Sequence, residues 1–485
     1  MKYAFYYLSR AIVLLAGLTL YFQVQAAMNG PFEREDHHLS ISLRNYYQYR
    51  QLKDYTPQYD EMPQRVVKTH DRQKAWGQGM AINFESATWG SESMGVGFDF
   101  SLYGGLKLNG ENDRYGTTIL KEDAPHYDAE HQRYLAKQES YGKLGLANIN
   151  AYLADERWDM RLVGGWIPIE KPLLQTYHRL TPTSFQGVLA EAQISNVHLY
   201  GAWADKVSLY NWDKMENFTS QQPGKGGRYG KHEVINSIYT VGGGYKSDLG
   251  LGGHLAYAAS ESYLQLYFAR IDYTFDLSET STLLLDGHFY QGRENGDKWW
   301  GGAVTYGGFD KDAHLYNVNT KLTMDGLAIL ASFTQVKAEK KGGLGFFDGH
   351  LAYDAGNDFD DFDYWTKRQL SGFDHNGEKV WQLGVRYSFD KDQVPGLSLG
   401  YTYTEGRDIE ASDNRIFPDK YEESEHNIEL KYAFQQPELD GLQLTILYAW
   451  NKMDKEISQL KNDNKWLYKG MSDTRVFLDY VLKVF

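Results

Sequence analysis

The segment WQLGVRYSF, residues 381–389, alternates strictly between apolar and polar positions. Its apolar members are Trp381, Leu383, Val385, Tyr387 and Phe389. Period two is the side-chain period of a β-strand, so these rings and aliphatic groups share one face, and Arg386 lies on the other. Residues 428–434, 442–450 and 476–484 repeat the pattern. An apolar face with aromatic ends opposite a charged face is typical of a wall between lipid and water, although a soluble β-sandwich also alternates.

Extending this reading along the chain predicts eighteen strands with short and long connections in turn. The predicted strands are 38–50, 75–86, 93–108, 142–153, 157–167, 188–194, 197–209, 233–246, 251–259, 263–276, 281–291, 312–323, 326–337, 380–389, 396–405, 426–435, 440–452 and 474–484. The long connections are 51–74, 109–141, 168–187, 210–232, 292–311, 338–379, 406–425 and 453–473, with one short exception near Ser260. This predicts an all-β fold, an antiparallel transmembrane β-barrel with short periplasmic turns and long extracellular loops.

The composition agrees with a barrel more than with a soluble enzyme. The chain has 485 residues, a formal charge of −14 and a mean hydropathy of −0.57, but aromatic residues reach 15 % and Cys is absent. Without Cys, a disulfide scaffold and a Cys-ligated metal site are excluded. After residue 26 no run of 18 apolar residues occurs, so a membrane crossing would require a closed barrel. The acidic charge disfavours a nucleic-acid partner.

The N-terminus has the features of a secretory signal peptide. Lys2 and Arg10 precede or flank an apolar stretch at 11–22, and small residues end it at Ala26. The stretch is short for an uncleaved anchor. We therefore predict a signal peptide at 1–26 and a barrel domain at 27–485, and removing the two basic residues takes the charge from −14 to −16.

Several ordered motifs resemble a known family, the OprD-type substrate-specific porins. They are LRNYY at 43–47, WGQG at 76–79, GVGFD at 95–99, GLKL at 105–108, and RLTPTSFQG at 179–187 after Pro168 and Pro172. Two further motifs, YLQLYFA at 263–269 and NGEK at 376–379, look like the chitoporin branch in particular. The resemblance covers nearly the whole mature chain.

This resemblance implies an eighteen-stranded channel in the cell outer membrane that passes small solutes passively. It also implies a constriction made by inward-folded third and seventh loops, here 168–187 and 338–379, with Tyr177, Arg179 and Phe185 near the narrowest point. Members of the family often take carboxylates, and the chitoporin branch is associated with chito-oligosaccharides. Outer-membrane lipid and lipopolysaccharide are the expected surroundings. A monomer and a trimer both remain open.

Five basic residues fall on the predicted lumen face. They are Arg44, Arg161, Arg270, Arg386 and Lys431. A planar guanidinium can hold a carboxylate through two hydrogen bonds, which would suit amino acids or aromatic acids. Alternatively, these groups pair with inward acids such as Asp99, Asp272 and Glu429 and fill the lumen.

The loop 338–379 combines aromatic and acidic residues, among them Asp360, Asp361, Tyr364 and Trp365. Aromatic faces can stack on sugar rings while carboxylates accept hydroxyl hydrogens, but the same rings could simply pack a folded loop. The acidic run lacks the spacing of a calcium loop. An acidic channel mouth attracts cations and repels carboxylates, so we expect neutral or amine-bearing oligosaccharides rather than amino acids or aromatic acids.

The other function classes have less support. No HExxH motif and no phosphate-binding loop occurs, so we expect no catalytic residue, no metal ligand and no cofactor. An enzyme built on a barrel and a secreted glycan-binding β-protein are the alternatives.

Overall fold

The computed structural model describes most of the chain beyond its N-terminal region. The described residues are 32, 34–53, 56–57, 72–91, 93–110, 117–122, 126–128, 133–135, 137–175, 178–226, 232–299, 308–352, 364–390, 394–412, 419–457 and 466–485. The predicted signal peptide, residues 1–26, lies outside them.

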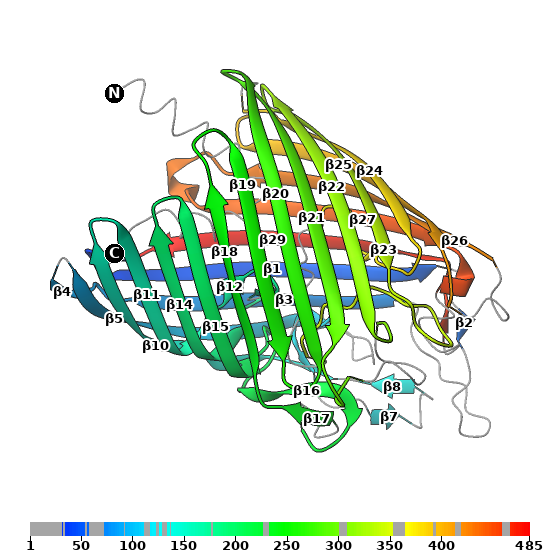
Figure 1. Ribbon diagram of the computed structural model, residues 1–485, viewed down its shortest axis with the longest axis horizontal. Coiled ribbons are helices and arrows are strands. Elements are labelled where there is room, and N and C mark those ends of the chain that lie inside the picture. Colours follow the sequence, from blue (N-terminus) through cyan, green and yellow to red (C-terminus); the bar gives the residue numbers. More distant parts are fainter. Residues whose placement is uncertain are drawn as a thin grey trace.

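In this described part, eighteen antiparallel strands form one closed barrel, which confirms the predicted fold and strand number (Figure 1). Its strands are β1(His38–Lys53), β3(Arg72–Glu85), β5(Met94–Gly110), β10(Tyr141–Asp155), β11(Trp158–Ile167), β14(Ser184–Ile194), β15(Val197–Ser208), β18(Ile238–Lys246), β19(Leu251–Ser260), β20(Leu264–Ser278), β21(Ser281–Glu294), β22(Asp312–Met324), β23(Leu327–Lys337), β24(Lys379–Ser388), β25(Leu397–Ile409), β26(Tyr421–Ala433), β27(Leu442–Met453) and β29(Gly470–Lys483).

The barrel closes between its first and last strands. β1 pairs with β29 from Ser40 opposite Lys483 to Lys53 opposite Gly470. Closure leaves no unpaired strand edge, which is the condition for burying a sheet in lipid. No helix among the described residues is long and apolar enough to cross a membrane.

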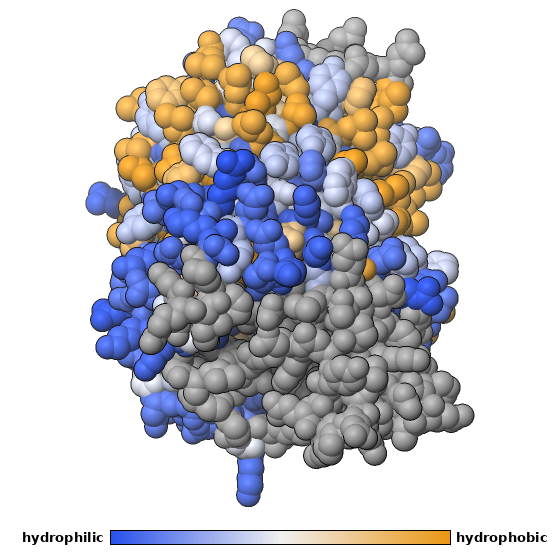
Figure 2. All heavy atoms as spheres, turned by 90° about the vertical axis from the view of Figure 1, so that its right-hand side faces the viewer, coloured by the Kyte–Doolittle hydropathy of each residue, from blue (hydrophilic) through white to orange (hydrophobic). Residues whose placement is uncertain are grey.

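Exposure alternates along the strands as the sequence pattern predicts. On β24, Trp381 and Leu383 are 62 % and 64 % exposed, whereas Gln382 between them is 2 % exposed. Their large apolar side chains therefore face outward, toward lipid. In the view of Figure 2, hydrophobic side chains gather on the upper wall, and hydrophilic ones lie lower, at the level of the small strands β16(Glu216–Pro223) and β17(His232–Ile235) in Figure 1.

The largest boundary differences occur at the loop ends of strands. β14 begins at Ser184 rather than at 188, because Ser184 to Gly187 pair with β15 and β11. The third long loop is accordingly 168–183. The predicted strand 233–246 is divided, since His232–Ile235 pairs with β16 and only Ile238–Lys246 belongs to the barrel wall.

Short strands also occur within the loops and turns. They are β2(Thr56–Pro57), β4(Trp89–Ser91), β6(Lys121–Glu122), β7(His126–Asp128), β8(Arg133–Leu135), β9(Gln138–Glu139), β12(Glu170–Lys171), β13(Leu174–Gln175) and β28(Trp466–Leu467), with a 3-10 turn η1(Pro437–Leu439). β12 and β13 form a hairpin within the third loop.

Candidate functional site

A hydrophobic cluster occupies one side of the barrel interior. Inward side chains of β11 to β23, such as Leu189 and Phe268, pack there against loop residues such as Leu174 and Phe347. Close packing of apolar groups excludes water and solutes. Among the described residues, the strands β24 to β27, β29, β1 and β3 contribute no side chain to this cluster.

In the third loop, residues 168–183, Arg179 and Leu180 lie against the inner face of β3 and β1. The Leu180 side chain would be 2.6 Å from a Cβ at Gly77, and a Cβ at Gly79 would overlap the Leu180 backbone oxygen. From β1, the Arg44 guanidinium donates a hydrogen bond to the Arg179 carbonyl at 3.0 Å. The WGQG motif thus has a physical reason, because glycine at 77 and 79 lets the loop approach the wall.

The three predicted constriction residues have different outcomes. Arg179 is half-buried, with its guanidinium 5.2 Å from the Tyr210 ring centroid and bonded to the Thr117 carbonyl. Phe185 belongs to β14, not to the loop, and its fully buried ring lies 6.3 Å from that of Phe218. Phe185 therefore offers no surface to solutes, and its predicted place at the narrowest point is corrected. Tyr177 lies outside the described residues.

The described part of the seventh loop, residues 338–352 and 364–378, contacts β22 through Trp365 and docks on β26. The Glu425 carboxylate accepts hydrogen bonds from the backbone N–H groups of Leu370, at 3.1 Å, and Ser371, at 2.8 Å. Burial lowers the pKa of the neighbouring Arg368 to about 10, and the carboxylates of Glu425 and Glu429 oppose that shift. Arg368 therefore stays charged at neutral pH, inside the barrel.

The two loops reach neighbouring strands at different heights, the third loop β1 and the seventh loop β29. The seventh loop is held there by Gln369, whose amide donates to the Asp473 carbonyl at 3.0 Å and whose own carbonyl accepts from Arg475 at 3.2 Å. The third loop contacts Arg44, which is opposite Asp479 in the register. Residues 475 and 479 are four positions apart, or roughly 13 Å along a strand. The two loops therefore contact this wall at separate heights.

The aromatic and acidic residues predicted in the seventh loop are only partly available to a solute. Tyr364 is 3 % exposed and donates to the Gly372 carbonyl at 2.9 Å, so its ring packs the loop. Trp365 is half-buried, and its backbone N–H bonds to Asn317. Asp360 and Asp361 lie outside the described residues.

All five predicted wall bases are paired with acids. Arg44 contacts Asp479 at 2.7 Å, Arg161 contacts Glu191 at 3.7 Å, Arg270 contacts Asp286 at 2.8 Å and Asp272 at 3.3 Å, Arg386 contacts Glu429, and Lys431 contacts Glu429 at 3.5 Å. Sequence reasoning named Asp272 and Glu429 as possible partners but missed Asp479, Glu191 and Asp286. The cross-strand register, such as Arg44 opposite Asp479, was the signal that could have found the first of these.

Comparisons with known proteins agree with this architecture. A model of the family described as outer membrane porin, OprD family, matches residues 34–484. The chain is 24 % identical to Porin D of Pseudomonas aeruginosa over 98 % of both proteins. It is 23 % identical to Chitoporin of Escherichia coli over 300 residues, which cover 56 % of this chain and 58 % of that protein.

Solved structures share the fold at low identity. The crystal structure of Acinetobacter baumannii OccAB4 superposes with a TM-score of 0.70 and 19 % identity, over 94 % of this chain and all of that one. The structure of Pseudomonas aeruginosa OpdK with vanillate gives a TM-score of 0.66 and 18 % identity, over 93 % and 100 % of the two chains. The family model that matches residues 34–484 establishes that the chain belongs to the OprD family of outer membrane porins, channels for small solutes.

Proposed function

We propose that this porin passes neutral or amine-bearing oligosaccharides, with chito-oligosaccharides as the representative class. The observation that carries the proposal is the pairing of every predicted wall base with an acid. A guanidinium already bonded to a carboxylate must lose that partner before it can hold a solute carboxylate through two bonds. The partial similarity to a protein named Chitoporin points the same way.

Arg44 is the clearest case. Its Nε and Nη2 donate to the two oxygens of Asp479 at 2.7 and 3.2 Å, and its Nη1 donates to the Arg179 carbonyl at 3.0 Å. All three of its nitrogens are therefore engaged by the protein. The paired carboxylates can still accept hydrogen bonds from sugar hydroxyls, and the paired bases can donate to them. Neither group has to leave its partner.

An aromatic surface lies beside this ion pair. The Phe477 ring, half-buried on β29, is 4.2 Å from the Tyr46 ring and 5.5 Å from the Arg44 guanidinium carbon. Trp365 is the half-buried ring of the seventh loop. Since Tyr364 is buried, Phe477 and Trp365 replace it as the proposed stacking platform for an apolar sugar face.

Chito-oligosaccharides are expected to interrupt the ionic current of the wild-type channel in brief events. Each lost ring contact should shorten these events, by several-fold in the double variant Phe477→Ala with Trp365→Ala, because stacking contributes about 0.5–1.5 kcal/mol per aromatic contact. Single-channel recording in a planar bilayer measures this directly. Tyr364→Phe, which removes only a buried hydroxyl, is the matched control and should keep the wild-type dwell time. Absence of blocking by chito-oligosaccharides, together with ready permeation of benzoate or an amino acid, would favour the carboxylate alternative.

Catalysis has no place in this proposal. One pentapeptide, GLSLG at 396–400, fits the letters of a nucleophile-elbow motif. Ser398 lies within β25 and is paired to Lys431 of β26, whereas the elbow needs a sharp turn from a strand into a helix. A lack of hydrolysis of chito-oligosaccharides by the purified protein is the expected result.

Lipopolysaccharide is the proposed lipid partner at the loop end of the barrel. A groove of about 730 Å³ is lined by Lys53, Lys452, Lys455 and Lys469, against the acids Asp454 and Glu456. Its lining also includes Trp450, which faces outward two residues before Lys452. Aromatic girdles mark the membrane interface, so the lysines just beyond it suit the phosphates of the outer leaflet.

The double variant Lys452→Glu with Lys469→Glu should therefore co-purify with several-fold less lipopolysaccharide than the wild type. Phosphate and sugar analysis of the detergent-purified protein provides the measurement. Lys337→Glu is the control, since Lys337 is the last residue of β23, lies 3.6 Å from Glu339 and does not line the groove. Equal lipopolysaccharide content in all three proteins would show that the groove does not bind this lipid.

A further inference from the structure

A tight turn at the end of the seventh loop brings two metal-ligating side chains together. The turn runs from His375 to Glu378, with the Glu378 N–H bonded to the His375 carbonyl at 3.1 Å. Gly377 has φ +77°, a conformation that favours glycine. Asn376 fixes the turn, because its side chain accepts from the Ala338 N–H at 2.9 Å. The NGEK motif thus encodes a rigid turn, and the His375 N–H donates to the Glu378 carboxylate at 2.9 Å.

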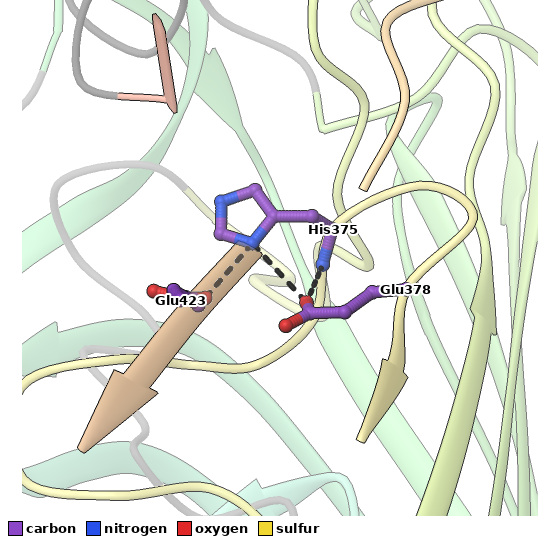
Figure 3. Close-up of side chains that lie close together, drawn as sticks. All are labelled: His375, Glu378 and Glu423. Atoms are coloured by element: carbon purple, nitrogen blue, oxygen red, sulfur yellow. Dashed lines mark hydrogen bonds and ion pairs between the residues drawn. The ribbon is translucent and has the colours of Figure 1, made fainter. Parts of the chain in front are cut away.

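The barrel wall supplies a third ligating group to the same point. The Nδ1 atom of His375 lies 3.3 Å from Glu378 Oε2 and 3.2 Å from Glu423 Oε1 of β26 (Figure 3). One nitrogen and two carboxylate oxygens lie within 4.8 Å of one another, and all three side chains are fully buried. Figure 3 shows the imidazole nitrogen directed between the two carboxylates.

The carboxylates are held in place from behind. Ser371 Oγ donates to the second oxygen of Glu423 at 2.6 Å. The Glu378 carboxylate rests against Gly406 of β25, where a Cβ would overlap its Oε1 atom. This Oε1 is buried and has no hydrogen-bond partner among the described residues. Supporting contacts of this kind orient the ligands in metal sites.

The distances are compatible with ligands placed around one ion. Elsewhere in this protein, histidine–carboxylate pairs range from 2.6 Å in His350–Asp348 and 2.8 Å in His288–Asp286 to 3.6 Å in His178–Glu170 and His198–Glu191. His375 Nδ1 has two carboxylate oxygens at 3.2 and 3.3 Å, although a single N–H cannot point at both. Zinc binds such nitrogen and oxygen atoms at about 2.0–2.2 Å, so two tetrahedral ligands lie about 3.3–3.5 Å apart.

We propose that His375, Glu378 and Glu423 bind one divalent transition-metal ion, with zinc best suited to the donor set. Calcium and magnesium prefer six or more oxygen ligands, whereas a site of one imidazole and two carboxylates suits zinc and leaves one position for water. The ion joins the last turn of the seventh loop to the wall strand β26, 45 residues further along the chain. It therefore acts as a structural clip on the loop that narrows the channel, independently of which solute passes.

The test is a count of zinc atoms in the full-length mature protein, folded in detergent with zinc chloride and dialysed extensively. We expect about one zinc per chain by mass spectrometry of the elements. Glu423→Gln, which keeps the size of the side chain and its contact with Ser371, should retain less than about a tenth of that amount. Ser371→Ala should weaken zinc affinity by about ten-fold or more through loss of a supporting hydrogen bond. His426→Ala, which removes a histidine stacked on Trp450 at 4.6 Å on the outer face, should keep the full amount.

Cobalt absorption and migration on gels test the same site in two further ways. Cobalt in place of zinc should give the strong visible absorption of a tetrahedral site in the wild type, and lose it in Glu423→Gln. Heat-modifiable migration on gels confirms that each variant has folded. A folded wild type that holds no more zinc than folded Glu423→Gln would overturn the proposal and leave the proposed permeation untouched.

Discussion

An arginine at position 383 is expected to lower the free energy of unfolding of the barrel by about 2–4 kcal/mol, the cost of a cation near the bilayer midplane. Leu383 lies at the middle of β24 and is 64 % exposed on the outer wall. The guanidinium would have to enter hydrocarbon or distort the lipid around it. Reversible unfolding in urea, with the protein in lipid vesicles, measures the change.

The matched control for this substitution is Thr402→Arg on the adjacent strand β25. Thr402 is opposite Gly384 in the register and belongs to the half-buried inner face, so its arginine can remain in water. Gly384 faces the lumen too, as the sequence predicts. A Cβ there would lie 2.9 Å from Leu330, so an arginine at 384 would add a steric cost to the effect of its charge. Equal losses of stability at 383 and 402 would contradict the assigned inner and outer faces.

The strands and their faces could be predicted because the relevant signal is local. In 381–389 every second residue reports which face meets lipid, and period two needs no knowledge of the rest of the chain. The ends of strands are different. Phe185 is preceded by a Pro-Thr-Ser segment that resembles a loop, yet tertiary pairing with β15 extends the strand to Ser184. Its burial therefore escaped prediction.

Contacts between loop and wall could not be predicted, because they join residues far apart in the sequence. Nothing near Gly79 indicates that the Leu180 backbone rests on it, and His375 gives no sign of Glu423. The basic wall shows the same limit. Period two correctly assigned Arg386 to the lumen side, but its partner Glu429 depends on the neighbouring strands of the sheet.

Replacing residues 176–182 of the third loop by three glycines is expected to raise single-channel conductance by at least about two-fold, because an open barrel of this strand number encloses a wide aqueous channel. The excised segment carries the Leu180 backbone that rests on Gly79 and the Arg179 carbonyl that binds Arg44. Without that carbonyl, Arg44 has a nitrogen free for anions. The reversal potential in a salt gradient should therefore shift toward anion selectivity as the conductance rises.

A substitution that adds one carbon atom to the wall tests the effect of the loop's position while its length stays the same. Gly79→Ala places a Cβ 2.2 Å from the Leu180 carbonyl oxygen, so the loop must move toward the lumen, and the conductance should fall or fluctuate. Gly104→Ala on the neighbouring strand β5 is the control, since its Cβ has no neighbour closer than 3.6 Å. If the excision leaves conductance unchanged in a folded barrel, and Gly79→Ala behaves like Gly104→Ala, the third loop does not limit the channel. The narrowing would then depend on the seventh loop, held to β26 and β29 by Glu425 and Arg475.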